Sequence, residues 1–233
     1  MRYALLVSLL GLMSLAGCEP VSVEMEDDGP SMRTVWPDGG DIPADEWIPR
    51  GLRRTESGYY SWVQPGSAVG GWEGRCGQTA MANIAWHCGY ILSPDDATRY
   101  VPDLTPGVRP GRLASGLNDF VGGACGEFRV CRPDIDAGAQ PLRWLQDKVH
   151  AYGRGYPTPV LISQRDALHW VVVMEIREPE DGSCTVVYLE DGRETHRSCG
   201  LFVQTWALDF NLSGLLTRDT ILGRYTAICR RER

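Results

Sequence analysis

One cysteine of this chain occupies a position that favours sulfur nucleophile chemistry. Cys76 follows a glycine-rich stretch at 70–74, which a helix tolerates poorly, and after it apolar residues recur at the spacing of one helical face. These residues are Ala80, Met81, Ile84, Ala85 and Cys88. A helix that begins at the cysteine presents unpaired N–H groups and the positive end of its dipole to the thiol, and both stabilise the thiolate. The sequence therefore predicts Cys76 as a nucleophile.

A cysteine nucleophile needs an imidazole that acts as its base and then as an acid. Of the four histidines, His87 lies eleven positions along the same helix as Cys76, about 16 Å away by helical rise, and is excluded. His150 falls near the end of an expected exposed helix, where it would interact with the helix dipole, and His196 falls inside an expected hairpin. His169 opens an apolar, β-branched strand, where a structural histidine is harder to explain. We therefore predict His169 as the base.

A third group should orient the imidazole, and strand register decides which residue that is. If the turn that follows the His169 strand is centred on Glu180, Asp191 lies opposite His169. If residues 181–182 form a two-residue turn instead, Glu194 lies opposite His169. Asp191 is also suited to be the first residue of a hairpin turn. The residues alone leave both registers open.

The expected elements place helices first and antiparallel strands after them. Ser93 is a capping residue, Pro94 suits the first helical position, and two acids follow in the first turn. Further helices are expected at 112–120 and 141–152, and strands at 158–163, 169–176 and 220–229. This order predicts an α+β fold.

The first residues have the pattern of an export signal. An apolar run at 4–16 is too short to span a bilayer, and it ends in Leu15-Ala16-Gly17-Cys18, which resembles the bacterial lipobox. The resemblance implies a signal peptide over 1–17, cleavage before Cys18 and lipid on that cysteine; the alternative is a plain secretory peptide. Because Glu19 follows and not aspartate, the resemblance also implies a lipoprotein of the bacterial cell envelope, anchored in the outer membrane.

The remainder divides into a tether and one domain. Residues 18–50 are acidic and proline-rich without apolar periodicity, which indicates a solvated spacer; a propeptide lying across the active site is the alternative. Residues 51–233 are enough for one sizeable domain. With 23 Lys and Arg against 30 Asp and Glu, the charge balance argues against nucleic acid as a partner.

One disulfide can be predicted from hairpin geometry. Asp191-Gly192 separates two strand-like runs at 185–190 and 193–198, and this dipeptide is a strong hairpin signal. With these two residues as the turn, Cys184 faces Cys199 across the hairpin. Directly opposed residues have Cα atoms about 4.5–5.5 Å apart, which is within disulfide range.

The other cysteines are assigned by elimination. The chain has eight cysteines, and exported chains can oxidise their thiols. With lipid on one cysteine and one nucleophile, six remain. Cys125 and Cys131 enclose a short loop and are expected to pair, which leaves Cys88 for Cys229. No Cys-x-x-Cys occurs and the histidines are scattered, so we expect neither a metal site nor a cofactor.

Four segments, taken together, resemble a known family. In order they are Cys76-Gly-Gln-Thr-Ala-Met-Ala-Asn-Ile, Tyr156-Pro-Thr-Pro-Val-Leu-Ile, His169-Trp-Val-Val-Val and Val187-Tyr-Leu-Glu-Asp191. They resemble the papain-like cysteine peptidases, and most closely the bacteriocin leader ("double-glycine") peptidases and their stand-alone relatives. The resemblance runs from about Gln64 to Cys229. It implies a papain-like fold, in which the helix of the nucleophile packs on a C-terminal antiparallel sheet.

The resemblance also implies roles for single residues. Cys76 would be the nucleophile, His169 the general base and then acid, and Asp191 the residue that orients His169. A glutamine upstream of the cysteine would help to hold the oxyanion, and the candidate is Gln64, twelve positions before Cys76. The backbone N–H of Cys76 is the other candidate donor. The implied reaction is attack of the thiolate on an amide, followed by hydrolysis of the acyl-enzyme.

The implied substrate is a peptide or a peptidoglycan-type amide. Leader peptidases are usually fused to a transporter, whereas no apolar stretch of this chain after the first approaches the length of a membrane span. The membrane would then be a partner only through the N-terminal lipid. Two other functions fit the same residues: a catalytically silent binding lipoprotein that keeps the papain-like fold, and an acyltransferase on the same scaffold.

Overall fold

The structure is a computed structural model, and it describes most of the expected domain. The described residues are 48–66, 75–102, 108–150, 157–164, 167–180, 182–207 and 225–231. The expected signal peptide, the predicted lipidation residue Cys18 and nearly all of the expected tether lie outside these ranges.

Five helices and eight strands lie within the described ranges. The helices are α1 (Cys76–His87), α2 (Pro94–Ala97), α3 (Pro110–Cys125), α4 (Pro141–His150) and α5 (Cys199–Ala207). The strands are β1 (Leu52–Arg54), β2 (Tyr60–Trp62), β3 (Glu127–Cys131), β4 (Thr158–Gln164), β5 (Ala167–Arg177), β6 (Thr185–Glu190), β7 (Arg193–Ser198) and β8 (Ala227–Arg231).

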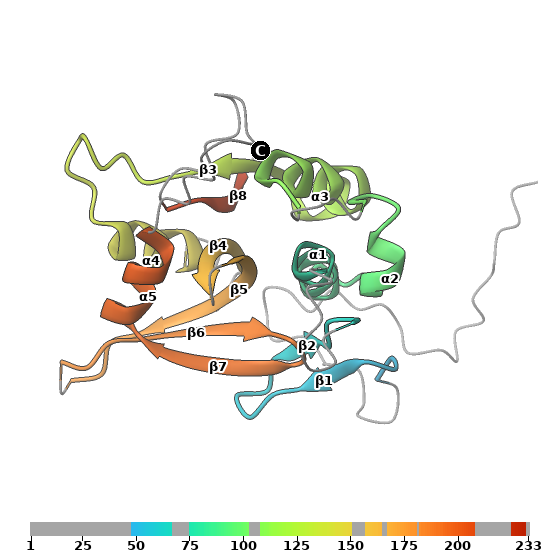
Figure 1. Ribbon diagram of the computed structural model, residues 1–233, viewed down its shortest axis with the longest axis horizontal. Helices are drawn as coiled ribbons and strands as arrows, with labels where there is room; N and C mark the ends of the chain where they lie inside the picture. Colours follow the sequence, from blue (N-terminus) through green and yellow to red (C-terminus); the bar gives the residue numbers. More distant parts are fainter. Residues whose placement is uncertain are drawn as a thin grey trace, which may run out of the picture. The chain divides into compact units, whose positions relative to one another are not determined.

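Six strands form one antiparallel sheet in the order β3-β8-β4-β5-β6-β7, and β1 and β2 form a separate hairpin (Figure 1). The β6–β7 turn is formed by Asp191 and Gly192, whose φ angles of 47° and 72° are both left-handed, as a two-residue hairpin turn of this kind requires. Cys184 and Cys199 flank this hairpin and are joined by a disulfide, which confirms the predicted pair.

Helices cover both faces of the sheet, and the alternation of side chains along β5 shows why. Trp170 and Val172 pack into a core with α1 and α3, whereas Val171 and Val173 pack into a second core with α4 and α5. A strand that is buried on both faces has a continuous apolar sequence, which is the pattern of β5. Helix α1, which begins at Cys76, therefore packs on an antiparallel sheet, as the α+β prediction requires.

Several expected elements differ in extent from the observed ones. The helix expected at 112–120 is the longer α3, and the strand expected at 220–229 is observed only as β8, since 208–224 are outside the described residues. Ser93 caps α2 as predicted, because its hydroxyl accepts a hydrogen bond from the N–H of Asp96 at 3.1 Å. No pattern in the sequence predicted α5 or strands β1 to β3.

Two of the three predicted disulfides are wrong. The structure pairs Cys88 with Cys125 and Cys131 with Cys229, instead of Cys125 with Cys131 and Cys88 with Cys229. The segment taken for a loop is strand β3, whose five residues extend over about 13 Å and carry Cys131 away from Cys125. Cys125 instead ends α3 beside Cys88, which caps the C-terminus of α1.

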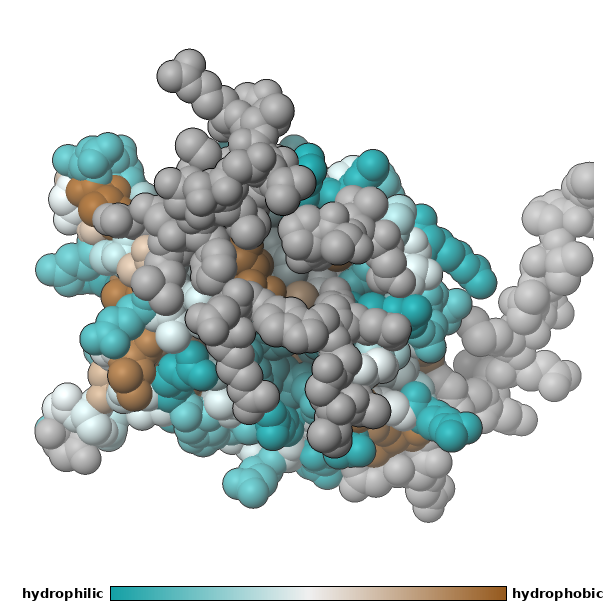
Figure 2. Space-filling view, viewed as in Figure 1, coloured by the Kyte–Doolittle hydropathy of each residue, from teal (hydrophilic) through white to brown (hydrophobic). Residues whose placement is uncertain are grey.

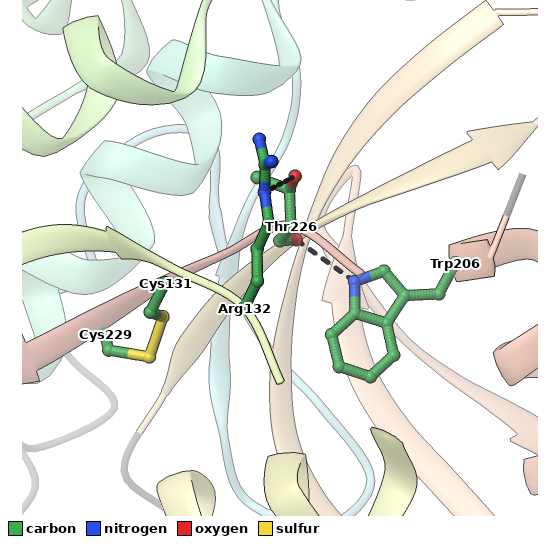
Figure 3. Close-up of a disulfide and its surroundings, with 5 residues drawn as sticks. All are labelled: Cys131, Arg132, Trp206, Thr226 and Cys229. Atoms are coloured by element: carbon green, nitrogen blue, oxygen red, sulfur yellow. Dashed lines mark hydrogen bonds between the residues drawn. A yellow bond between two sulfur atoms is a disulfide. The ribbon is translucent and has the colours of Figure 1, made fainter. Parts of the chain in front are cut away.

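The Cys131–Cys229 disulfide joins β3 to β8 at a well-connected part of the sheet (Figure 3). Arg132 donates from Nε to the hydroxyl of Thr226 at 3.1 Å, and the indole of Trp206 on α5 donates to the Thr226 carbonyl at 3.1 Å. These bonds connect the start of β8 both to the segment after β3 and to α5.

On the face shown in Figure 2, most of the described surface is hydrophilic. Apolar colour occurs in small patches, the most extensive of them at the left, where Figure 1 places α4 and α5. Across the described residues, the exposed large apolar side chains are Val130, Ile135 and Leu201. Of the helices that the structure describes, none is long and apolar enough to cross a membrane.

Candidate active site

Helix α1 begins at Cys76, as predicted, and contacts on both sides hold its first turn in place. Thr79 donates from its hydroxyl to the carbonyl of Arg75 at 2.9 Å, and the Arg75 guanidinium pairs with Asp95 on α2. Cys76 itself is only 6% exposed and is the free cysteine among those described. The thiol is therefore fixed at the N-terminal end of the helix.

The structure brings together Cys76 and His169, the two residues predicted as nucleophile and base. Burial alone would raise the pKa of the Cys76 thiol, but its hydrogen bond to the His169 ring and the charge of that ring lower it below its ordinary value. The N–H groups of Trp170 and Gly77 add hydrogen bonds to the sulfur. Burial likewise opposes the charge of His169, yet hydrogen bonds to Cys76 and Glu190 raise its pKa to about 9. Both pKa shifts favour a thiolate beside an imidazolium.

The N–H of Trp170 can reach the sulfur because β6 leaves β5 at this point. The β5–β6 ladder runs only as far as Val172, opposite Leu189. Trp170 lies beyond that end, so its N–H on this edge of β5 is directed to Cys76. The separation of β5 and β6 beyond Val172 therefore leaves the Trp170 N–H free of the β5–β6 ladder and available to the Cys76 sulfur.

Val108 connects the first turn of α1 to the strand that carries His169. A Cβ on Gly77 would lie 2.5 Å from the Val108 Cβ, so the first turn of α1 packs against Val108 at a distance that only glycine allows. The carbonyl of Val108 accepts a hydrogen bond from the indole of Trp170 at 2.9 Å. Trp170 is the neighbour of His169, so one residue contacts both halves of the site.

The carboxylate beside His169 is that of Glu190. His169 Nε2 lies 3.4 Å from Glu190 Oε2, and the two side chains are 20% and 5% exposed. The other oxygen, Oε1, accepts from the Thr195 hydroxyl at 3.0 Å and lies 3.8 Å from the Arg193 guanidinium. Burial alone would raise the pKa of Glu190, but His169, Thr195 and Arg193 together lower it. The Glu190 carboxylate therefore favours its ionised form, and its charge in turn favours the protonated form of His169.

This arrangement corrects the prediction that Asp191 orients His169. The β5–β6 register shifts by one residue between Val173 and Glu175. If the pairing of Glu175 with Val187 continued unchanged along the strands, Asp191 would lie on the same side of the sheet as His169. The one-residue shift places Glu190 on that side instead. A β-bulge thus decides which of two adjacent carboxylates faces the base. Sequence reasoning missed Glu190, and the only signal for it was the pair of acids at 190–191.

Asp191 and Gln64 meet each other instead. Asp191 Oδ1 accepts a hydrogen bond from the backbone N–H of Gln64 at 3.0 Å. The segment that ends in Gln64 therefore lies against the β6–β7 turn, next to Glu190. The role of the Gln64 side chain as an oxyanion donor stays a prediction.

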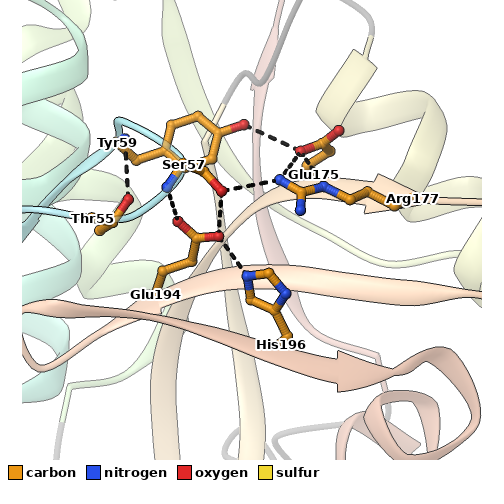
Figure 4. Close-up of polar contacts among 7 residues, drawn as sticks. All are labelled: Thr55, Ser57, Tyr59, Glu175, Arg177, Glu194 and His196. Carbon is orange, nitrogen blue, oxygen red and sulfur yellow. Dashed lines mark hydrogen bonds and ion pairs between the residues drawn. The ribbon is translucent and has the colours of Figure 1, made fainter.

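The alternative partner Glu194 belongs to a different polar cluster (Figure 4). Its carboxylate, whose side chain is 4% exposed, accepts from the Ser57 hydroxyl at 2.6 Å and lies 2.5 Å from the ring of His196. Arg177 on β5 also donates to Ser57, at 3.2 Å, and pairs with Glu175 at 2.8 Å. The cluster fastens the β1–β2 turn to the sheet and engages His196, so neither Glu194 nor His196 serves the thiol.

Other chemistry-bearing residues lie apart from this site. His87 is buried in α1, and desolvation lowers its pKa to about 4 despite a bond to the backbone of Tyr60, so it is a neutral core histidine. His150 ends α4, on the opposite face of the sheet from α1. Within the described ranges, no group of three or more His, Cys, Asp or Glu side chains is placed to hold a metal ion.

Comparisons with known proteins found a similarity in structure and none in sequence. Among solved structures, the peptidase domain of Streptococcus ComA, described as a bi-functional ABC transporter involved in a quorum-sensing pathway, is similar to this chain with a TM-score of 0.42 and 16% sequence identity. The match covers 67% of this chain and 92% of the ComA domain. Neither a protein-family model nor a curated protein matches the sequence.

Proposed function

We propose that this chain is a papain-like cysteine peptidase or amidase, in which Cys76, His169 and Glu190 act together on an amide bond. The observation that carries the proposal is the geometry: the buried Cys76 thiol at a helix N-terminus contacts His169, whose Nε2 lies 3.4 Å from the buried Glu190 carboxylate. A structural cysteine has no need of a low pKa, whereas a nucleophile does.

The proposed reaction has two halves. The Cys76 sulfur attacks the amide carbonyl carbon, the C–N bond breaks, and the His169 imidazolium gives its proton to the leaving amine. Water then gives a proton to His169 and attacks the thioester carbon. The C–S bond breaks, the carboxylic acid leaves, and Cys76 and His169 again share one proton between them. The N–H of Cys76 and the side chain of Gln64 are the proposed donors to the oxyanion.

The test is release of amine from peptides and from peptidoglycan fragments, followed by mass spectrometry in oxygen-18-labelled water. We expect the mature protein to produce new amine ends and to place the label in the new carboxylate. Cys76→Ala should produce neither, because it removes the atom that forms the thioester. Products that carry an added amine instead of the label would identify an acyltransferase.

A silent binding protein would give a different result. In that case the wild-type protein and Cys76→Ala would both leave every amide intact, and iodoacetamide would alkylate Cys76 in the folded wild-type protein no faster than an ordinary exposed thiol. That combination would contradict the proposed function.

We also propose that the enzyme acts in the cell envelope, anchored in the outer membrane by lipid on Cys18. The three disulfides support an oxidising compartment, and the lipobox-like end of the signal sequence supports cleavage before Cys18. We expect the N-terminal peptide of the protein from membranes to carry the lipid mass, and Cys18→Ala to leave the membrane fraction. An unmodified Cys18 in membrane-derived protein would argue against the anchor.

A further inference from the structure

The segment 62–64, which begins at the last residue of β2, contacts both the helix of Cys76 and the turn that follows Glu190. The backbone N–H of Trp62 donates to Asn83 Oδ1 on α1 at 2.8 Å, and the Trp62 carbonyl accepts from the N–H of Gly192 at 2.8 Å. Two residues later, the N–H of Gln64 donates to Asp191 Oδ1 at 3.0 Å. The segment 62–64 thus connects the helix of the nucleophile to the β6–β7 turn.

These contacts are buried and close. Asn83 is 1% exposed and Trp62 is 2% exposed, so their hydrogen bond is shielded from water. A Cβ on Gly192 would lie 2.5 Å from Val63 Cγ2, so the turn packs directly on the segment and leaves no room for a side chain. The distance between residues 62–64 and the β6–β7 turn therefore has little freedom to change.

The turn that is held in this way begins immediately after Glu190. Glu190 faces His169, and Asp191 is the next residue in the chain. A displacement of Asp191 and Gly192 would move Glu190 with them, because consecutive Cα atoms are a fixed distance apart. The separation between α1 and Glu190 is thus set through residues 62–64.

We infer that Asp191 is a positioning residue, which acts through the backbone of Gln64 to hold Glu190 against His169. The inference rests on the proposed Cys76–His169–Glu190 site. Asp191 contributes as a hydrogen-bond acceptor for an N–H, and its charge is not what orients the imidazole. The two adjacent carboxylates therefore have different roles: Glu190 stabilises the imidazolium, and Asp191 holds Glu190 in position.

The test compares Asp191→Gly with Asp191→Asn. Glycine tolerates the left-handed backbone at this position but offers no acceptor, whereas asparagine tolerates it and keeps Oδ1. We expect Asp191→Gly to lower the rate of Cys76 alkylation by iodoacetamide near pH 6 about tenfold, the scale of a lost hydrogen bond to a charged group. It should also speed hydrogen exchange at residues 62–66. Asp191→Asn should behave as wild type in both measurements.

A matched control is available in another turn. Asp134 Oδ1 accepts from the N–H of Ala137 at 3.0 Å, so Asp134→Gly removes the same kind of bond elsewhere. It should change neither the alkylation rate of Cys76 nor exchange at 62–66.

Each other outcome overturns the inference. If Asp191→Asn loses as much alkylation rate as Asp191→Gly, the charge matters and not the acceptor. If Asp191→Gly only lowers the melting temperature and leaves the pH dependence of alkylation unchanged, the residue is merely structural. Failure of the proposed function is distinguishable, because wild-type Cys76 would then be unreactive, while exchange at 62–66 would still report whether Asp191 holds the segment.

Discussion

Replacing His169 with alanine is expected to lower the rate at which iodoacetamide alkylates Cys76 about a hundredfold near pH 6. In the wild-type protein the His169 ring holds the pKa of Cys76 below its ordinary value, against the burial that would raise it. Without the ring, the thiol is expected to have a pKa of about 8.5 or higher, so less than about one per cent of it is thiolate at pH 6. Only the thiolate reacts, so the rate falls with its fraction.

The difference should shrink as the pH rises through about 9. His169 has its pKa raised to about 9, so the imidazolium that stabilises the wild-type thiolate is present below that value and lost above it. The thiol of the variant ionises without help in the same range. Two alkylation curves that stay parallel from acid to alkaline pH would contradict the thiolate–imidazolium pair.

His196→Ala is the matched control for this experiment. His196 also pairs with a buried carboxylate, Glu194, in the same sheet, but its partners belong to the cluster around Ser57. We expect this variant to keep the wild-type alkylation profile of Cys76. A loss of reactivity equal to that of His169→Ala would mean that the assay reports general loosening of the sheet and not the base.

Cys76 and His169 could be selected from the sequence as a candidate nucleophile and base because each choice depends on a local pattern. The helix start at Cys76 is set by the change from glycines to helical periodicity, and His169 is set by the apolar strand that it opens. The orienting carboxylate could not be predicted in the same way. Its identity depends on a register shift between Val173 and Glu175, and no residue type in this apolar run marks where a bulge will form.

The cysteines show the same division between local and long-range information. Cys184 and Cys199 could be paired because a two-residue turn fixes which residues of a hairpin are opposite. The other four cysteines required the three-dimensional order of distant elements, since β8 inserts between β3 and β4 in the sheet. Elimination by loop length failed there because the short segment after Cys125 is an extended strand.

Removal of the Cys131–Cys229 disulfide should have the largest effect on stability. Its cysteines are 98 residues apart, against 37 for Cys88–Cys125 and 15 for Cys184–Cys199. The longest loop constrains the unfolded chain most, so the double alanine variant should lose about 4–5 kcal/mol in free energy of unfolding. Denaturant unfolding under non-reducing conditions measures this loss.

The Cys184→Ala, Cys199→Ala double variant is the matched comparison, because it removes a disulfide that closes a much shorter loop. We expect it to lose about 3 kcal/mol, since the entropy of loop closure grows only with the logarithm of loop length. Both variants truncate two cysteine side chains in the same way, so any loss of packing should be similar in the two. The difference between their losses in free energy of unfolding should therefore remain. If the short-loop variant loses as much stability as the Cys131–Cys229 variant, loop constraint does not govern the effect. Peptide mapping that linked Cys125 to Cys131 would overturn the pairing itself.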